Sequence, residues 1–179
     1  KQWNWHTLSS HMNITFDDIE NNLELPWDWK GISYMNNIIC DQIKRHIDKP
    51  WCFENLTYNR SLTEDIIEAF PDKPWNWYML SYNPNITWEF IKQHLDKPWN
   101  IFILLENVSI PYEEVHMIIT KDRYWYPYSK NPIVDVDIIK NHLDKMWDWY
   151  YVCRNYNISF DDVENNKDLP WHYDVLSYH

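Results

Sequence analysis

One 24-residue pattern recurs along this chain without an insertion or a deletion, and this regularity limits how the chain can fold. Tryptophan occupies the same position of every copy except one, where Arg123 replaces it. The tryptophans of this column are Trp3, Trp27, Trp51, Trp75, Trp99, Trp147 and Trp171. Tandem repeats of this kind are typical of stacked supersecondary units. The pattern therefore predicts one repeat array over residues 1–179, about seven and a half units long, whose units start near residues 2, 26, 50, 74, 98, 122, 146 and 170.

Each unit is predicted to form two short helices of about eight to ten residues. Proline is favoured in a first helical turn, so we expect Pro74 to open a helix that continues through Leu80. A second helix is expected after Thr87, because threonine is a favourable N-cap and Glu89 would face the positive helix end. The equivalent caps are Thr15, Thr63 and Ser159, of which Thr15 with Asp18 and Ser159 with Asp162 have the spacing of a capping box. Helices this short need tertiary packing, so each unit must stack on the next.

Apolar columns define the expected core, and one of them argues against a competing fold. Leu80, Ile86 and Ile91 represent three columns that are apolar in almost every copy. A leucine-rich repeat has a similar length but needs an apolar residue two positions before Leu80. That column holds His6, Lys30, Glu54, Tyr78, Phe102, Tyr126, Tyr150 and Asp174. The predicted fold is therefore an all-α solenoid of helix-turn-helix repeats.

The adjacent aromatic residues of a unit cannot all face one core. Trp75 and Trp77 are two positions apart, so on a helix they would point to nearly opposite sides. We expect one ring of the pair to pack against the neighbouring repeat or against the turn between helices.

Composition and motifs disfavour several classes of function. The net charge of −11 argues against binding a phosphate backbone, and no apolar stretch is long enough to span a membrane. With Gly31 as its single glycine, the chain has no glycine-rich phosphate loop, and it carries neither GxSxG nor HExxH. Acidic pairs such as Asp17-Asp18 fall in a helix first turn, where capping is their expected role. We therefore expect no enzyme activity and no cofactor.

Polar columns inside the repeat are interpreted as structural. The column of His46, His94 and His142 repeats at intervals too long for one metal ion, so these residues are expected to be half-buried at helix ends. The asparagine column could form a polar binding ladder, but asparagine near a helix end more often takes a left-handed cap or bonds the turn backbone. Its members are Asn59, Asn83, Asn107, Asn131 and Asn155. The three cysteines form no CxxC motif and are interpreted as reduced, incidental thiols.

Two features are candidates for binding a protein partner. The column of Tyr34, Tyr58, Tyr82 and Tyr178 holds Ser, Glu, Lys or Arg in other units, which indicates exposure. Exposed tyrosines can anchor a partner, although a packed belt at the helix ends is an equal alternative. The second candidate is Arg123, because the unit that contains it has lost both proline and tryptophan. This break predicts either a bend in the array, which is favoured, or a local contact site.

The motif also resembles a known group of repeats. The segment from Tyr82 to Glu89, YNPNITWE, and the segment HLDKPWN that starts at His94 are similar to the Trp- and Asn-rich tandem repeats of large giant-virus proteins of the mimivirus type. The resemblance implies a viral protein in the host cytoplasm or the virion, which are reducing compartments. It supplies no catalytic residues. We expect a segment of a longer chain that acts as a scaffold for a protein partner, or alternatively as a structural spacer without a specific ligand.

Overall fold

The chain folds into short helices only. The computed structural model describes residues 3–35 and 38–177, and within these ranges it contains α-helices and one 3-10 helix but no strand. The first helices of successive units are α1 (Trp5–Ser9), α3 (Trp29–Ile32), α5 (Phe53–Leu56), α7 (Trp77–Leu80), α9 (Ile101–Asn107), α11 (Trp125–Tyr128), α13 (Trp149–Val152) and α15 (Tyr173–Leu176). The second helices are α2 (Phe16–Glu20), α4 (Cys40–Arg45), α6 (Glu64–Ala69), α8 (Trp88–Gln93), α10 (Tyr112–Val115), α12 (Val136–Asn141) and α14 (Phe160–Asn165). The all-α prediction is confirmed.

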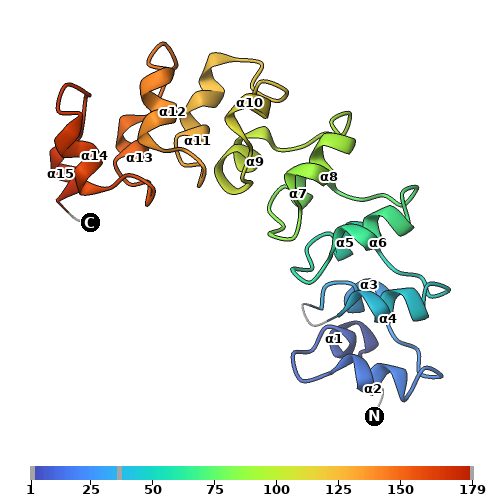
Figure 1. Ribbon diagram of the computed structural model, residues 1–179. Coiled ribbons are helices and arrows are strands. Elements are labelled where there is room, and N and C mark those ends of the chain that lie inside the picture. The colour runs from blue at the N-terminus through green and yellow to red at the C-terminus, as the bar shows by residue number, and fades with distance from the viewer. Residues whose placement is uncertain (1–2, 36–37, 178–179) are drawn as a thin grey trace. The chain divides into compact units, whose positions relative to one another are not determined.

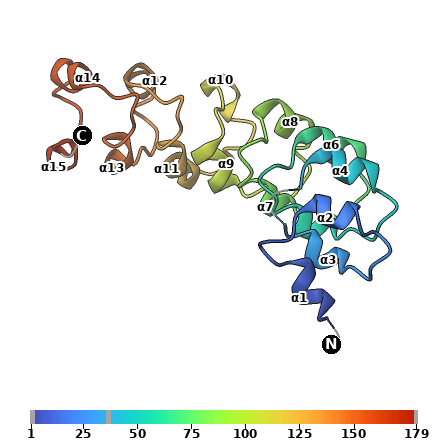
Figure 2. The same cartoon turned by 90° about the horizontal axis from the view of Figure 1, so that it is seen from below.

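The helices are arranged in two rows within each of two compact units. The first unit comprises Lys1–Ile86 and the second Thr87–His179. The first unit and the second unit are these two compact parts, whereas successive, neighbouring or preceding units are single 24-residue repeats. In the first unit, α1, α3, α5 and α7 lie in one row and α2, α4 and α6 in another (Figure 1). In the second unit, α9, α11, α13 and α15 form one row, and α8, α10, α12 and α14 form the other (Figure 2). We call these the first-helix row and the second-helix row of each unit.

The apolar columns form the core of both units, as the sequence predicts. In the first unit Ile32, Leu56 and Leu80 are fully buried, and Ile43 and Ile67 are almost so. In the second unit the equivalent buried residues include Leu104, Val152, Ile139 and Val115, and Tyr128 takes the place of leucine without becoming exposed. Burial of a large aliphatic side chain contributes about 1.5–3 kcal/mol, so these repeated contacts supply much of the free energy that the short helices lack on their own.

The helices are shorter than predicted, and proline does not open the first one. Helix α7 begins at Trp77 and Asn76 is its N-cap, whose side chain accepts the amide hydrogen of Met79 at 3.1 Å. Pro74 precedes the helix because the Trp75 amide donates to the Lys73 carbonyl at 2.8 Å, which closes a three-residue γ-turn around the proline. The fixed φ of proline suits that turn. The observed α-helices span four to seven residues, not eight to ten.

Capping of the second helix agrees with the sequence. Thr15, Thr63, Thr87 and Ser159 are N-caps. The side chain of Thr15 accepts the Asp18 amide hydrogen, and the Asp18 carboxylate accepts the Thr15 amide hydrogen in return at 2.9 Å. Ser159 and Asp162 form the same reciprocal pair. Both capping boxes are therefore confirmed, and the hydrogen bonds from Thr15 lower the pKa of the Asp18 carboxyl.

The tryptophan column closes the turn after each second helix. The indole N–H of Trp51 donates to the carbonyl of His46 at 2.8 Å, and the ring packs edge-on against Trp29 of the preceding unit at 4.9 Å between centroids. The same indole bond to the residue five positions earlier is made by Trp27, Trp75, Trp99, Trp147 and Trp171. One ring of each aromatic pair thus contacts both the turn and the neighbouring repeat. His46, His94 and His142 are half-buried C-caps, as predicted.

The asparagine column joins successive units through their backbones. Asn131 is fully buried; its side-chain amide donates to the carbonyls of Leu105 and Val108, both at 2.7 Å, and its oxygen accepts the Ile133 amide hydrogen. Asn59, Asn83 and Asn155 make equivalent bonds. Bonding to the turn backbone is confirmed, whereas a left-handed cap is wrong, because no described residue has a positive φ. An amide enclosed this way is not available to an external ligand.

A hydroxyl column, which the sequence analysis missed, makes a second set of bonds between units. The hydroxyl of Ser33 donates to Trp29 O at 2.7 Å and accepts the amide hydrogen of Cys52 from the next unit at 3.0 Å. Ser9, Thr57 and Ser129 accept equivalent amide hydrogens. Cys153 replaces the hydroxyl with a thiol, which accepts the His172 amide hydrogen at 3.3 Å. Its position is therefore structural and not incidental.

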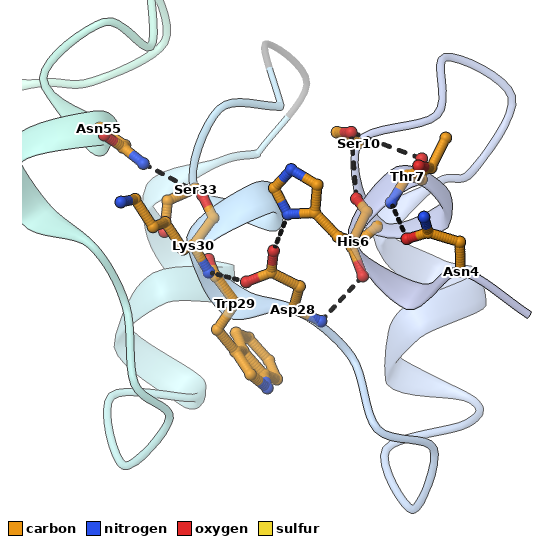
Figure 3. Close-up of polar contacts among 10 residues, drawn as sticks. Asn4, His6, Thr7, Ser10, Asp28, Trp29, Lys30, Ser33 and Asn55 are labelled. Carbon is orange, nitrogen blue, oxygen red and sulfur yellow. Dashed lines mark hydrogen bonds and ion pairs between the residues drawn. The ribbon is translucent and has the colours of Figure 1, made fainter.

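Capping side chains add further contacts between units. Asp28, the N-cap of α3, accepts the Lys30 amide hydrogen with one oxygen and bonds the His6 ring of the preceding unit with the other (Figure 3). The hydrogen bond with His6 is the main reason why the pKa of the Asp28 carboxyl lies below its usual value. The Asn55 amide donates to the Lys30 carbonyl at 3.1 Å and extends this network to a third unit of the repeat.

Candidate functional site

The three predicted tyrosines of the first unit lie at the surface. Tyr34, Tyr58 and Tyr82 are 54%, 46% and 50% exposed, and each follows a first helix by two residues. We call these three residues the tyrosine row. Half of each ring is accessible, so the row is not a packed belt. Tyr178 of the same column lies outside the described residues.

Neighbouring members of the tyrosine row either contact each other or line the same surface pocket. The Tyr34 and Tyr58 ring centroids are 6.2 Å apart with a tilt of 36°, which is within the range of interacting aromatic pairs. Tyr58 and Tyr82 line one surface pocket of about 210 Å³, together with Arg60 and Met79. Rings that are held side by side lose little conformational freedom on binding, which favours their use as anchors.

Arg123 belongs to the second unit and lies in a different environment. It is exposed within the 3-10 helix η1 (Asp122–Tyr124), and its guanidinium stands 5.3 Å from the Tyr124 ring centroid and 5.9 Å from that of Phe102. These separations are within the range of cation–π contacts. Arg123 therefore does not replace the buried tryptophan ring of other units; it extends over the rings of Phe102, which is exposed, and Tyr124, which is half-buried.

A pocket of about 390 Å³ opens beside the neighbours of Arg123. Its lining includes Lys121, Asp122 and Lys145 as well as His116 and Glu113. Cations and carboxylates are mixed around this pocket, so its charge favours neither an anionic nor a cationic ligand. Its volume is at the lower end of the range for small-molecule sites.

A second set of exposed aromatic side chains was not predicted from the sequence. Phe102, Tyr126 and Tyr150 occupy one column of the repeat and are 41–45% exposed on the first helices of the second unit. The available signal was that this column holds His, Lys and Glu in its first three copies and Asp in its last, but aromatic residues in the four copies from Tyr78 to Tyr150.

The described residues form no metal-binding cluster. Within them, no group of three His, Cys, Asp or Glu side chains is arranged to hold a metal ion. Cys40, Cys52 and Cys153 are free thiols, and burial raises the pKa of the Cys153 thiol, which disfavours its reactive form. Over residues 3–35 and 38–177, none of the helices combines the length and the apolar character needed to cross a bilayer.

The fold and surface together define an all-helical, tryptophan-rich protein with aromatic side chains exposed on its first helices. No protein-family model matches the chain, and comparisons with characterised proteins and with solved structures gave no significant match.

Proposed function

We propose that the chain is an α-solenoid that presents a binding surface for a protein partner, and that it acts by binding and not by catalysis. Three observations support stacking of the units. The hydroxyl, asparagine and aromatic columns each repeat one kind of contact between neighbouring units. Examples are the contacts of Ser33 with Cys52, of Asn59 with Ile38 and of Trp29 with Trp51. Nearest-neighbour contacts of this kind are what stabilise repeat proteins.

The observation that carries the binding function is the exposure of the tyrosine row. A core residue that recurs at every 24th position is accounted for by the free energy of its burial. The half-exposed tyrosines in three consecutive units bury less surface, so they contribute little to the free energy of folding. Tyrosine is enriched among residues that dominate interface energies. The resemblance to giant-virus repeats leads us to propose a viral protein that acts in the host cytoplasm or the virion, with direct nucleic-acid binding disfavoured by the charge of −11.

A structural spacer is the alternative, and one observation favours it. The best-conserved contacts within the repeat, such as the indole bond of Trp75 and the buried amide of Asn83, serve only to hold units together. A spacer would need nothing further, and its exposed tyrosines would be replaceable.

The test is quantitative affinity capture from host-cell extract with the whole chain and two matched variants. One variant changes Tyr34, Tyr58 and Tyr82 to Ser. The control changes three exposed apolar residues elsewhere in the first unit to Ser, namely Met12, Ile39 and Ile47. Circular dichroism must first show the same helical content for all three proteins. We expect a partner that the tyrosine variant loses and the control retains.

Two results would contradict the proposal. Equal capture by all three proteins would remove the tyrosine row from the binding surface, and capture of no partner by any of them would favour the spacer. The solenoid itself is tested by deleting one 24-residue unit, residues 50–73: a solenoid closes up and stays helical with lower stability, whereas another helical fold would collapse.

A further inference from the structure

We propose that a second surface, on the first-helix row of the second unit, binds an extended acidic segment of a partner protein. This surface, called the cation–aromatic strip, consists of Phe102, Arg123, Tyr126, Lys130, Tyr150 and Arg154. The proposal rests on the binding function proposed above and gives it a site and a class of partner that the tyrosine row does not supply.

The strip is continuous from α9 to α13. Arg123 extends over the Phe102 ring of α9. One turn further along α9, Glu106 accepts a hydrogen bond from Lys130 at 2.7 Å, and the ammonium of Lys130 stands 4.0 Å from the Tyr151 ring centroid of α13. These contacts link three consecutive first helices side by side, in agreement with the row in Figure 2.

The last part of the strip lies on α13 and just beyond it. The Tyr151 and Tyr150 centroids are 5.3 Å apart, and the Arg154 guanidinium is 5.7 Å from the Tyr150 ring. Tyr150 and Arg154 are four residues apart, which is about one helical turn, so they lie on the same side of α13 and the residues that follow it. Tyr126 and Lys130 have the same spacing one repeat earlier. Each of these two repeats thus carries an exposed aromatic residue four positions before a cation, of which Arg154 is exposed and Lys130 is half-buried.

The two arginines of the strip have unused capacity for anions. In the part of the chain that the structure describes, no carboxylate is within ion-pair distance of Arg123 or Arg154, and both side chains are exposed. An arginine guanidinium can hold a carboxylate through two parallel hydrogen bonds. Lys130 is already paired with Glu106, so it helps to hold the first-helix row together and adds little new attraction.

Charge and spacing favour an acidic polypeptide as the occupant. Arginine and tyrosine together are typical of interface hot spots, and free arginines on a chain of net charge −11 provide a local site for carboxylates. Packed helices are about 8–10 Å apart and an extended chain advances about 3.3 Å per residue, so residues about three positions apart on an extended partner would lie over successive first helices. A nucleic acid fits less well, because its affinity requires many phosphate contacts and the chain as a whole repels polyanions.

The experiment measures fluorescence anisotropy of labelled probes with the whole chain. The main probe is a peptide of about twelve residues with Glu at every third position and Leu or Phe between, long enough to span about four helices. The second probe has Lys in place of Glu, and the third is single-stranded oligothymidine of similar length. The test variant changes Arg123 and Arg154 to Glu. Its control changes Lys140 on α12 and Lys167 just after α14 to Glu, which alters the net charge equally.

We expect the acidic peptide to bind the unaltered chain and the control, with an affinity about tenfold or more weaker for the Arg variant, and weaker in high salt. A further variant, with Tyr126 and Tyr150 changed to Ser, should also lose affinity and keep the charge. Preference for the basic peptide, tighter binding of oligothymidine, or equal losses in the Arg variant and the control would each overturn the proposal.

Failure here is distinguishable from failure of the proposed function. If the acidic peptide does not bind but the tyrosine variant still loses a captured partner, the strip is excluded and the binding function stands. If neither surface binds a partner or a peptide, both proposals are contradicted and the alternative, a structural spacer, is favoured.

Discussion

The two units use the same core but differ in what they expose and in how their helices end. In the first unit, Ser33 caps α3 with its hydroxyl, and the helix stops at Ile32. In the second unit Ser129 and Cys153 keep this ending, but in the repeat of α9 the same column holds Leu105, which is fully buried, and α9 continues to Asn107. Leu104 and Ile110 remain buried in spite of this change. The apolar columns therefore determine the fold, whereas the polar columns determine where each helix ends and can vary.

Their surfaces differ in a related way. The first unit exposes tyrosines beside one another, as in the pair Tyr34 and Tyr58, while the second intersperses rings with Arg123 and Arg154. A repeat in which the core is fixed by a few columns leaves the exposed positions free to vary from unit to unit. One array can thereby carry surfaces of different chemistry.

The largest expected effect comes from removing a core tryptophan from each unit. Trp75→Ala and Trp147→Ala should each lower the free energy of unfolding by about 3–5 kcal/mol, because both rings are buried and their indole N–H groups bond the preceding turn. Urea denaturation followed by circular dichroism measures the loss. Trp3→Ala, whose ring is 68% exposed, is the control and should cost less than about 1 kcal/mol. A much smaller loss at Trp147 would show that the two cores are not equivalent.

A second variant tests the asparagine bonds of the second unit between the repeats of α9 and α11. Asn131→Ala leaves the carbonyls of Leu105 and Val108 without their donor, so it should destabilise the protein by about 1–3 kcal/mol in urea denaturation. Asn107→Ala, in the same column but exposed on α9, should change stability by less than about 0.5 kcal/mol. Equal effects would contradict the view that the column acts through buried bonds.

The hydroxyl column offers a smaller test of how units are joined. Ser33→Ala removes the acceptor of the Cys52 amide hydrogen and should cost about 1 kcal/mol. Cys153→Ser restores the usual hydroxyl in the second unit, so it should leave the thermal midpoint unchanged or raise it slightly. A loss of stability in Cys153→Ser would mean that the thiol is held there by its packing and not by its hydrogen bond.

The smallest expected effect concerns pH in the first unit. The hydrogen bonds of Glu20 with Arg45, and secondarily with His46, hold the pKa of its carboxyl below the usual value. The stability that this ion pair contributes is therefore fully present above the unfolded pKa, about 4.3, and is lost as the pH falls through the lower folded pKa. Glu20→Gln should cost less than about 1 kcal/mol at pH 7 and reduce the acid sensitivity of the thermal midpoint below pH 4.3. An unchanged pH profile would contradict the assignment.

Much of the fold could be predicted because its signals are periodic. Thr15 and Ser159 were identifiable as caps from the acidic residues that follow them, and Leu80 as core from its column. The start of the first helix could not be predicted correctly, since Pro74 suits a γ-turn as well as a first helical turn. The choice depends on the position of the Trp75 ring, which packs edge-on against Phe53 of the preceding repeat, and that packing is a tertiary contact.

The candidate site was predictable only in part. Exposure of Tyr34 followed from the polar residues that replace it in other units, and the structure confirms it. The strip was missed because no single column contains it: Tyr150 and Arg154 belong to different columns and meet only through the spacing of one helical turn. The hydroxyl column was missed because Ser33 could equally have been a solvent-exposed residue, and only its bond to Cys52 shows its role.

The indole bond described above also has a kinetic consequence. Trp51 reaches a carbonyl only five residues behind it, and the hydroxyl of Ser33 receives an amide hydrogen from 19 residues ahead. Contacts so near in sequence are quick to form, because little chain entropy is lost in closing them. During synthesis each completed unit could therefore dock on its predecessor within one further repeat of chain, so that folding keeps pace with the ribosome instead of waiting for the last residue.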